Sequence, residues 1–194
     1  EEPDIKFHVQ PFSDSQKINK PHDFNEYTAS VLQLRPESAG HLELRSADMR
    51  DQPAIHPNYL ATKTDQDTIV EGIRIARRIA RTEPVASVIT DEYSPGWDMD
   101  EADYDALLDW ARNTATTIYH PTGTCKMGHD PMAVVDDRLR VHGVTGLRVA
   151  DASIMPVIVS GNTNAPTIMI GEKASDMVLA DAAKTAPAQL EAAQ

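Results

Sequence analysis

The sequence predicts an α+β fold, because three strand-like segments open the chain, two helical segments follow, and a strand–loop–helix arrangement comes last. Residues 5–12 alternate apolar and polar side chains, which is typical of a half-buried strand. Residues 27–34 and 41–46 are predicted to form the second and third strands. The short loop between these two contains Gly40, so we expect them to pair as an antiparallel hairpin.

The first helix is predicted to begin at Thr64 and Asp65, which are residue types that cap helices. Its apolar positions recur at helical spacing, at Ile69, Ile73, Ala76 and Ala80. Four arginines lie mostly on the opposite side, near the helix end where the dipole favours cations: Arg74, Arg77, Arg78 and Arg81. We interpret them as a solvated helix face, and the alternative is a basic binding patch.

A second helix is expected to begin near residues 98–100, with acidic side chains in its first turn. Its buried stripe is predicted to consist of Tyr104, Leu107, Leu108 and Ala111, flanked by Trp110.

The last third of the chain is predicted to contain two short strands and a helix. Residues 138–151 indicate the two strands, with a glycine-containing turn between them. Residues 164–181 indicate the helix, which Asn164 can cap and which tolerates Pro166 in its first turn. Its early residues are apolar on all sides, which predicts deep burial of Ile168, Met169 and Ile170.

Composition excludes several classes of partner. The formal net charge of −12 argues against nucleic acid and against an anionic membrane surface, because both require a basic patch. No apolar run reaches the roughly 18 residues of a membrane span, and the first residues do not resemble a signal peptide. The single cysteine, Cys125, fits a reducing compartment. Because strand-like alternation begins already at Ile5, we expect the segment to derive from a longer protein.

The segment 119-YHPTGTCKMGHD-130 is the first candidate for chemistry. Pro121 restricts the backbone of His120, which holds the imidazole on a stiff support, and histidine is the usual general base near neutral pH. The alternative is a structural histidine that bonds a backbone carbonyl. A zinc site formed by His120, Cys125 and His129 is disfavoured, because the sequence offers no fourth ligand at a suitable spacing.

The segment 160-SGNTNAPT-167 is the second candidate. Asn162 and Asn164 flank Thr163 immediately before the last predicted helix, where unpaired backbone N–H groups and the helix dipole stabilise negative charge. The asparagine amides add further donors. The alternative is ordinary helix capping.

These motifs together resemble a known family. The segments 120-HPTGTCKMG-128, 134-VVDDRLRVHGVTGLRVADASIMP-156 and 161-GNTNAPTIMIGEKASDMV-178 resemble the C-terminal portion of the glucose-methanol-choline (GMC) flavin oxidoreductases, among them choline dehydrogenase-like bacterial members. The segment 35–60 resembles the same family, so the likeness extends over roughly residues 3–182.

The resemblance implies an FAD enzyme that oxidises a primary alcohol, choline or another, to an aldehyde. In that family the histidine of the H-P-x-G-T motif acts on the substrate hydroxyl, which is His120 here, and a second residue before the last helix corresponds to Asn162. The flavin-contacting segments of the family correspond to Asp151, Ala152, Asn164 and Ala165. The implied partners are the alcohol and an electron acceptor, either oxygen or a quinone-type carrier.

One feature of such enzymes is absent from the sequence. The G-x-G-x-x-G turn that cradles the FAD pyrophosphate does not occur, so we expect the nucleotide-binding half to lie in a separate, N-terminal portion. The expected divisions are a substrate-binding portion over 1–118, a catalytic-loop portion of the FAD domain over 119–182 and a flexible tail over 183–194. A cytoplasmic location is expected, with peripheral attachment to the inner membrane left open. Two alternatives remain: a non-catalytic interaction module, and a metal-dependent enzyme using residues 120–129.

Overall fold

The computed structural model describes residues 3–12, 14–15 and 20–191. The chain divides into two compact units, Glu1–Thr116 and Thr117–Gln194, and each is described by itself. The expected α+β class is confirmed, since small antiparallel sheets and helices occur together. No helix among the described residues has the length and apolarity needed to cross a lipid bilayer.

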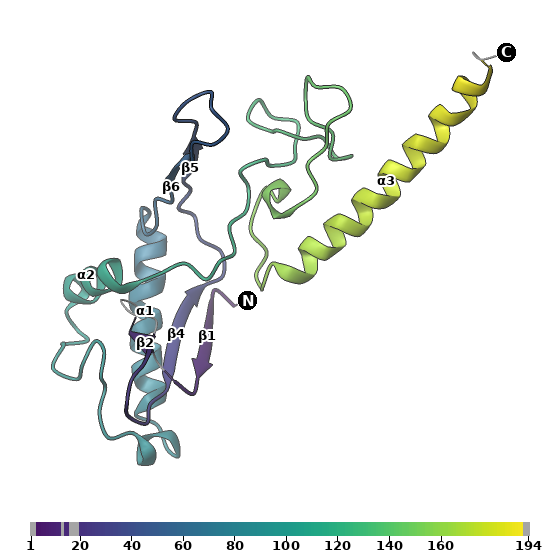
Figure 1. Cartoon of the computed structure of the whole chain (residues 1–194). Coiled ribbons are helices and arrows are strands. Elements are labelled where there is room, and N and C mark those ends of the chain that lie inside the picture. The colour runs from purple at the N-terminus through teal and green to yellow at the C-terminus, as the bar shows by residue number, and fades with distance from the viewer. Residues whose placement is uncertain (1–2, 13, 16–19, 192–194) are drawn as a thin grey trace. The chain divides into compact units, whose positions relative to one another are not determined.

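The main strand pair of the first unit joins β1 (Ile5–Gln10) to β4 (Thr28–Gln33). The two strands are antiparallel, with Phe7 opposite Val31, and a second small pair joins β2 (Asp14–Ser15) to β3 (Lys20–Pro21). Figure 1 shows the β1–β4 pair lying beside the first helix. The strand positions predicted at residues 5–12 and 27–34 are therefore correct, with slightly shorter ends.

The expected hairpin between residues 27–34 and 41–46 is wrong. β4 pairs with β1, while β5 (His41–Glu43) pairs with β6 (Ala54–His56). The reason is the path of the linker. The buried carboxylate of Asp65 accepts hydrogen bonds from the amides of Glu37 and Ser38 at 2.9 and 2.8 Å, which holds the linker at the start of the first helix. A loop held in this way does not close a tight turn.

Helix α1 (Lys63–Ala80) begins slightly before the expected start at Thr64 and Asp65. Thr62 is the N-cap residue, and its side chain accepts from the amide of Asp65, which lies in the first turn. It packs closely on β4: a Cβ at Gly72 would lie 2.3 Å from Cγ1 of Val31, so only glycine permits this approach. The helix contributes Val70 and Ile73 to the core of the unit.

Helix α2 (Tyr104–Thr114) begins later than the expected 98–100. The acidic residues from 100 onward form a turn instead, in which the amide of Asp103 bonds the carbonyl of Asp100 at 3.1 Å, and Asp103 then caps the helix. The predicted stripe is confirmed: Leu107, Leu108 and Ala111 are buried against α1, with Tyr104 and Trp110 packed at the edge. A short 3-10 turn, η1 (Val85–Val88), lies between the two helices in sequence.

Arg77 contradicts the prediction of a solvated arginine face, because it is only 2% exposed. Its guanidinium forms two hydrogen bonds with the carboxylate of Glu92, at 2.9 and 2.6 Å, and donates to the carbonyls of Met99 and Gly96. A buried charge requires such complete pairing. Arg78, by contrast, is exposed as expected.

The second unit consists of loops around the 3-10 turn η2 (Ala152–Ile154) and the long helix α3 (Asn164–Glu191) (Figure 1). The two strands predicted in 138–151 are reduced to an isolated antiparallel bridge between Arg140 and Arg148. The core is formed by side chains from the loops and from one face of α3: Val135, Leu139, Ile154, Met155, Ile170 and Ala174.

Helix α3 departs from the sequence prediction in two respects. Of the three apolar residues expected to be deeply buried, only Ile170 is, while Ile168 and Met169 are 58% and 52% exposed. They point away from the single face that meets the loops, where Ile170 and Ala174 lie one turn apart. The helix also continues through Glu191, into residues expected to be a tail.

Candidate active site

His120 lies in the loop that opens the second unit. The preceding residue, Tyr119, has a φ of 62°, a left-handed conformation that is uncommon for a residue with a side chain. Further along, the amides of Cys125 and Met127 donate to the carbonyls of Ser153 and Ile154, at 3.0 and 2.8 Å. These bonds attach the loop to η2.

Both nitrogens of the His120 ring have a partner from the segment that begins α3. Nδ2 of Asn162 lies 3.1 Å from Nε2 of His120, and Oγ1 of Thr163 lies 2.8 Å from Nδ1. The imidazole is half-buried, Asn162 is exposed, and Thr163 is only 6% exposed. Two adjacent residues therefore hold a histidine that lies some forty positions earlier in the sequence.

This arrangement provides an acceptor and a donor side by side. The amide nitrogen of Asn162 can only donate, so Nε2 accepts and carries a lone pair. A hydroxyl group placed between the two atoms could donate to Nε2 and accept from Nδ2. The site can therefore remove a proton from an alcohol and stabilise the negative charge that develops on its oxygen.

The four residues expected to contact a flavin lie in the same unit but outside this hydrogen-bonded group. Asn164 and Ala165 are exposed and form the start of α3. Asn164 is the first helical residue rather than the cap, because the residue before it accepts the first helical bond, from the amide of Thr167 at 3.0 Å. Asp151 caps η2 by accepting from the amide of Ser153 at 2.8 Å, and Ala152 is half-buried.

Thr163 was missed as a functional candidate. The sequence did contain a signal, because a threonine before a helix ordinarily accepts from an amide two or three positions into it, and the third position here is Pro166, which has no N–H.

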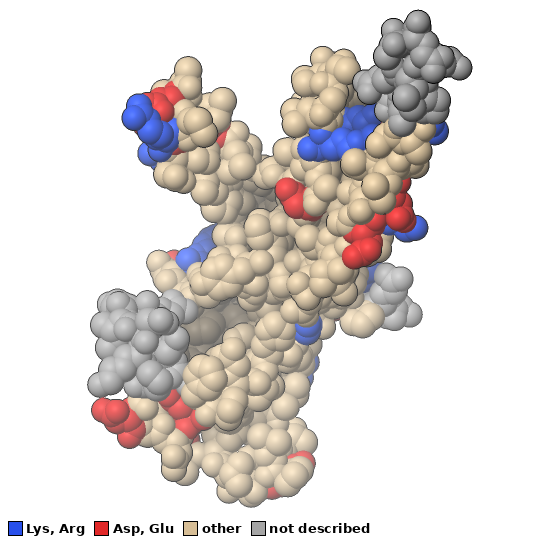
Figure 2. Space-filling view, turned by 45° about the vertical axis from the view of Figure 1, so that its right-hand side comes forward, with Lys and Arg blue, Asp and Glu red and all other residues tan. Residues whose placement is uncertain are grey.

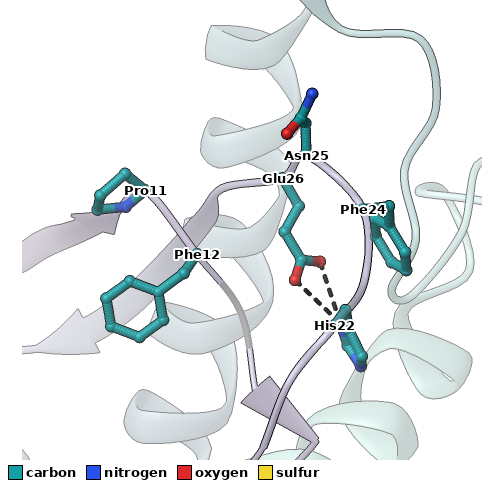
Figure 3. Close-up of a pocket in the computed structure, with 6 residues that line it drawn as sticks. All are labelled: Pro11, Phe12, His22, Phe24, Asn25 and Glu26. Carbon is teal, nitrogen blue, oxygen red and sulfur yellow. Dashed lines mark hydrogen bonds and ion pairs between the residues drawn. The ribbon is translucent and has the colours of Figure 1, made fainter.

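A pocket in the first unit is lined by Pro11, Phe12, His22, Phe24, Asn25 and Glu26 (Figure 3). Nδ1 of His22 lies 3.1 Å from both carboxylate oxygens of Glu26, and the imidazole stacks on Phe24 with 5.1 Å between ring centroids. None of the residues predicted from the sequence to carry chemistry lines this pocket.

Potential metal ligands cluster at one exposed place in the described part of the chain. Among the residues that the structure describes, potential ligand atoms gather within 4.8 Å only in the exposed group His41, Glu43 and His56, and residues 120–129 supply no such set. The two imidazoles stack with 4.5 Å between centroids and 18° between planes. Ring lone pairs lie in the ring planes, so two nearly parallel rings do not converge on one ion, and the group is better explained as a histidine pair beside a carboxylate.

Charged side chains of both signs lie close to one another on the surface. Figure 2 shows basic side chains in small, separate groups with acidic ones nearby, and no continuous basic surface among the described residues on that face. Ion pairs join charges of opposite sign, for example Asp181 with Arg138 and Arg148.

Comparisons with known proteins agree with the motifs. The profile of the C-terminal domain of the GMC oxidoreductases matches residues 36–171. Mitochondrial choline dehydrogenase of Mus musculus is 46% identical over 179 residues, which cover 91% of this chain and 30% of that protein. The alcohol dehydrogenase (acceptor) of Pseudomonas putida is 42% identical, over 91% of this chain and 32% of that protein.

Solved structures give the same result. A variant of Aspergillus oryzae formate oxidase, studied for its FAD modification, matches with a TM-score of 0.76 and 30% identity, over 86% of this chain and 29% of that chain. The chain thus spans about 30% of the length of the curated relatives it matches. The profile match, which covers more than half of the residues, shows that this chain belongs to the GMC oxidoreductase family and corresponds to its C-terminal domain.

Proposed function

We propose that this chain is the catalytic C-terminal portion of an FAD-dependent enzyme that oxidises a primary alcohol to an aldehyde. The observation that carries the proposal is the 3.1 Å contact between Nε2 of His120 and Nδ2 of Asn162. It combines a proton acceptor and a hydrogen-bond donor at one point, which is what removal of a hydroxyl proton requires.

His120 is the base in this proposal, and Asn162 is the oxyanion donor. The substrate oxygen takes the place of the direct bond between the two side chains. Its proton passes to Nε2, and the amide of Asn162 stabilises the charge left on the oxygen. Because an alkoxide releases hydride from its carbon far more readily than an alcohol does, the base prepares the carbon for oxidation.

FAD is the cofactor expected from the family, and when bound it supplies the acceptor for the hydride. The residues present fit its electron-rich ring edge: the first turn of α3 is exposed at Asn164 and Ala165, and the start of a helix carries partial positive charge. We assign Asp151 and Ala152 to the same ring contact. The sequence has no G-x-G-x-x-G turn for the pyrophosphate, so we assign that contact to a further portion of the enzyme.

The substrate class follows from the relatives' names, which include choline and alcohol dehydrogenases. A quaternary ammonium group would favour aromatic neighbours. Trp97, Tyr93 and Tyr119 are the aromatic candidates for this contact. The guanidinium of Arg81 already lies over the Trp97 ring, with Cζ 4.6 Å from the ring centroid, and Tyr93 packs on His22 and Phe24. Tyr119, which adjoins His120 and is 81% exposed, is therefore the residue we assign to such contact.

The electron acceptor is proposed to be oxygen or a quinone-type carrier. Oxygen is supported by the name of a relative, the oxygen-dependent choline dehydrogenase of Cronobacter sakazakii, which is 43% identical. The name of the Pseudomonas enzyme specifies an acceptor without its chemistry. The predicted cytoplasmic location stays a prediction.

The test replaces His120 in the full-length, FAD-loaded enzyme. We expect His120→Ala to slow reduction of the flavin by alcohol by about 10²–10⁴-fold, which is the usual contribution of a general base, while the flavin stays bound. Anaerobic stopped-flow absorbance measures both. His129→Ala is the matched control, because His129 is exposed in the same segment. A His120→Ala enzyme that reduces its flavin at the normal rate would refute the proposal.

A further inference from the structure

Thr163 contacts the ring nitrogen that the proposed reaction does not use. Its hydroxyl lies 2.8 Å from Nδ1 of His120, whereas Asn162 occupies the Nε2 side. Thr163 is also one of three polar or charged residues classed as buried among the described part of the chain. A buried hydroxyl bonded to a half-buried imidazole has a fixed direction, so this contact is suited to orient the ring.

The hydrogen bonds determine which nitrogen carries the proton. A neutral imidazole has one N–H and one lone pair. Because the amide of Asn162 donates to Nε2, the lone pair is there and the proton is on Nδ1. The Nδ1–H group then donates to Oγ1 of Thr163. The reverse assignment would place two donors, the Nε2–H and the Asn162 amide, against each other.

The local sequence explains why this hydroxyl is available to the histidine. The carbonyl of Thr163 accepts from the amide and hydroxyl of Thr167, at 3.0 and 2.6 Å, so Thr163 occupies the position that caps α3. One of the two amides from which a capping hydroxyl ordinarily accepts is absent, since Pro166 has no N–H. The hydroxyl of Thr163 bonds His120 instead.

We infer that Thr163 is a positioning residue for the proposed reaction: its hydroxyl holds the proton on Nδ1 of His120 and thereby keeps the lone pair of Nε2 directed at the substrate. The inference rests on the proposed function of His120. In the proton transfer, the substrate O–H bond breaks, its electron pair stays on oxygen, and a new N–H bond forms at Nε2. The ring becomes a cation, and the Nδ1–H···Oγ1 bond strengthens because its donor is now charged.

The experiment compares three variants of the full-length, FAD-loaded enzyme. Thr163→Val keeps the shape and removes the acceptor, so we expect flavin reduction at saturating alcohol to slow roughly ten-fold or more, as loss of a hydrogen bond to a charged group implies. Thr163→Ser restores the hydroxyl and is expected to restore the rate. Thr167→Val is the matched control, because it removes a hydroxyl bond from the same helical turn without touching His120. The concentration of alcohol for half-maximal reduction should change little.

A second measurement reports the tautomer without any turnover. In histidine-labelled enzyme free of substrate, ¹⁵N NMR is expected to show Nδ1 of His120 protonated and Nε2 unprotonated, with His120→Asn used to assign the signals. In Thr163→Val we expect the Nε2-protonated form to increase. Protonation of Nε2 in the unmutated enzyme would overturn the inference, even if Thr163→Val does not fold.

The outcomes separate the two proposals. Normal flavin reduction in His120→Ala would overturn the proposed function. An inactive His120→Ala together with a Thr163→Val enzyme of normal rate and unchanged tautomer would leave the proposed function intact and overturn the positioning role of Thr163.

Discussion

Buried polar side chains serve different purposes in the two units. In the first unit, the carboxylate of Asp65 accepts from the amides of Glu37 and Ser38 and from the side chain of Gln33, and it is 1% exposed. The guanidinium of Arg77 is enclosed in the same way. In the second unit, Thr163 is buried, but the chain of hydrogen bonds it begins leads outward through His120 to Asn162, which is exposed.

The difference teaches how to distinguish a structural polar cluster from a reactive one. Within the described part of the chain, no buried side-chain nitrogen or oxygen is left without a hydrogen-bond partner. The presence of hydrogen bonds therefore does not distinguish a structural cluster from a reactive one. The direction of the hydrogen bonds does. Asp65 and Arg77 direct all of them toward the chain itself, whereas His120 and Asn162 meet at the surface, where a substrate can replace their mutual bond.

The largest effect on stability is expected at Arg77. Arg77→Met leaves the carboxylate of Glu92 partly buried and unpaired, which costs about 3–5 kcal/mol. The free energy of unfolding of the full-length protein, measured by urea titration, checks this. Arg78→Met is the control, since Arg78 makes an exposed pair with Glu71 and should cost less than about 1 kcal/mol. If the two substitutions lowered the free energy of unfolding equally, the burial of Arg77 in its ion pair would not be the source of its stabilisation.

Asn162→Ala should have the opposite profile, with a large effect on rate and almost none on stability. Loss of an oxyanion donor slows reaction by about 10²–10³-fold. Stopped-flow flavin reduction gives the rate, and a thermal melt of the same sample gives the stability. Asn113→Ala, an exposed amide on α2, is the matched control. If Asn162→Ala lowered the melting temperature and left the rate of flavin reduction unchanged, Asn162 would be a structural residue and the contrast between the two units would be wrong.

Asp65→Asn sharpens the comparison from the structural side. Burial raises the pKa of the Asp65 carboxyl, but the hydrogen bonds from Ser38, Glu37 and Gln33 outweigh it and hold the pKa below its ordinary value. A depressed pKa contributes stability that is present above the unfolded value and is lost as the pH falls through the folded value. The substitution removes an acceptor and should cost about 1–3 kcal/mol at neutral pH.

The pH dependence checks this assignment. Unfolding titrations at several pH values should show a shallower loss of stability in acid for Asp65→Asn than for the unmodified protein. Asp109→Asn, on the exposed side of α2, is the matched control. Identical acid limbs in all three proteins would contradict the role of Asp65.

The smallest effect is expected at Asp136 in the second unit. The side chain of Arg140 lowers the pKa of the Asp136 carboxyl from 3.8 to about 2, aided by the backbone amides of Arg140 and Arg138. The ionised Asp136 carboxylate therefore stabilises the fold at pH values above its ordinary pKa, and this stabilisation disappears as the pH falls toward 2. Because the arginine is exposed, we expect about 1 kcal/mol at neutral pH, lost in Asp136→Asn. Asp137→Asn is the neighbouring control for the same acid titration.

Much of the site was predictable from the sequence, because local rules govern its parts. Pro121 after His120, and the asparagines before a helix, are short-range patterns, and the six residues expected to act on substrate or flavin all lie in the second unit. Their catalytic and flavin-binding roles stay predictions. The contact between His120 and Asn162 was expected only through the family resemblance, since nothing in the spacing of the two residues implies it.

The errors share one physical cause, which is that long-range contacts override local patterns. The loop ending at Gly40 has the composition of a hairpin turn, but the carboxylate of Asp65 holds it elsewhere. Arg77 follows the period of an exposed helix face, yet Glu92, fifteen positions later, encloses it. Ile168 and Met169 look like core residues, but only one face of α3 meets the loops.

The sequence by itself determined that three helices form, the apolar stripe of α2, and the candidate residues for the chemistry, because each depends on neighbours within a few positions. It did not determine the caps, since Thr62, Asp103 and Thr163 occupy the cap positions in place of the expected residues. Only the tertiary structure decided which strands pair, which arginine is buried, and that Thr163 bonds the second nitrogen of His120. These depend on contacts between residues that are distant in the chain, and a hydrogen bond forms only where the folded backbone places donor and acceptor about 3 Å apart.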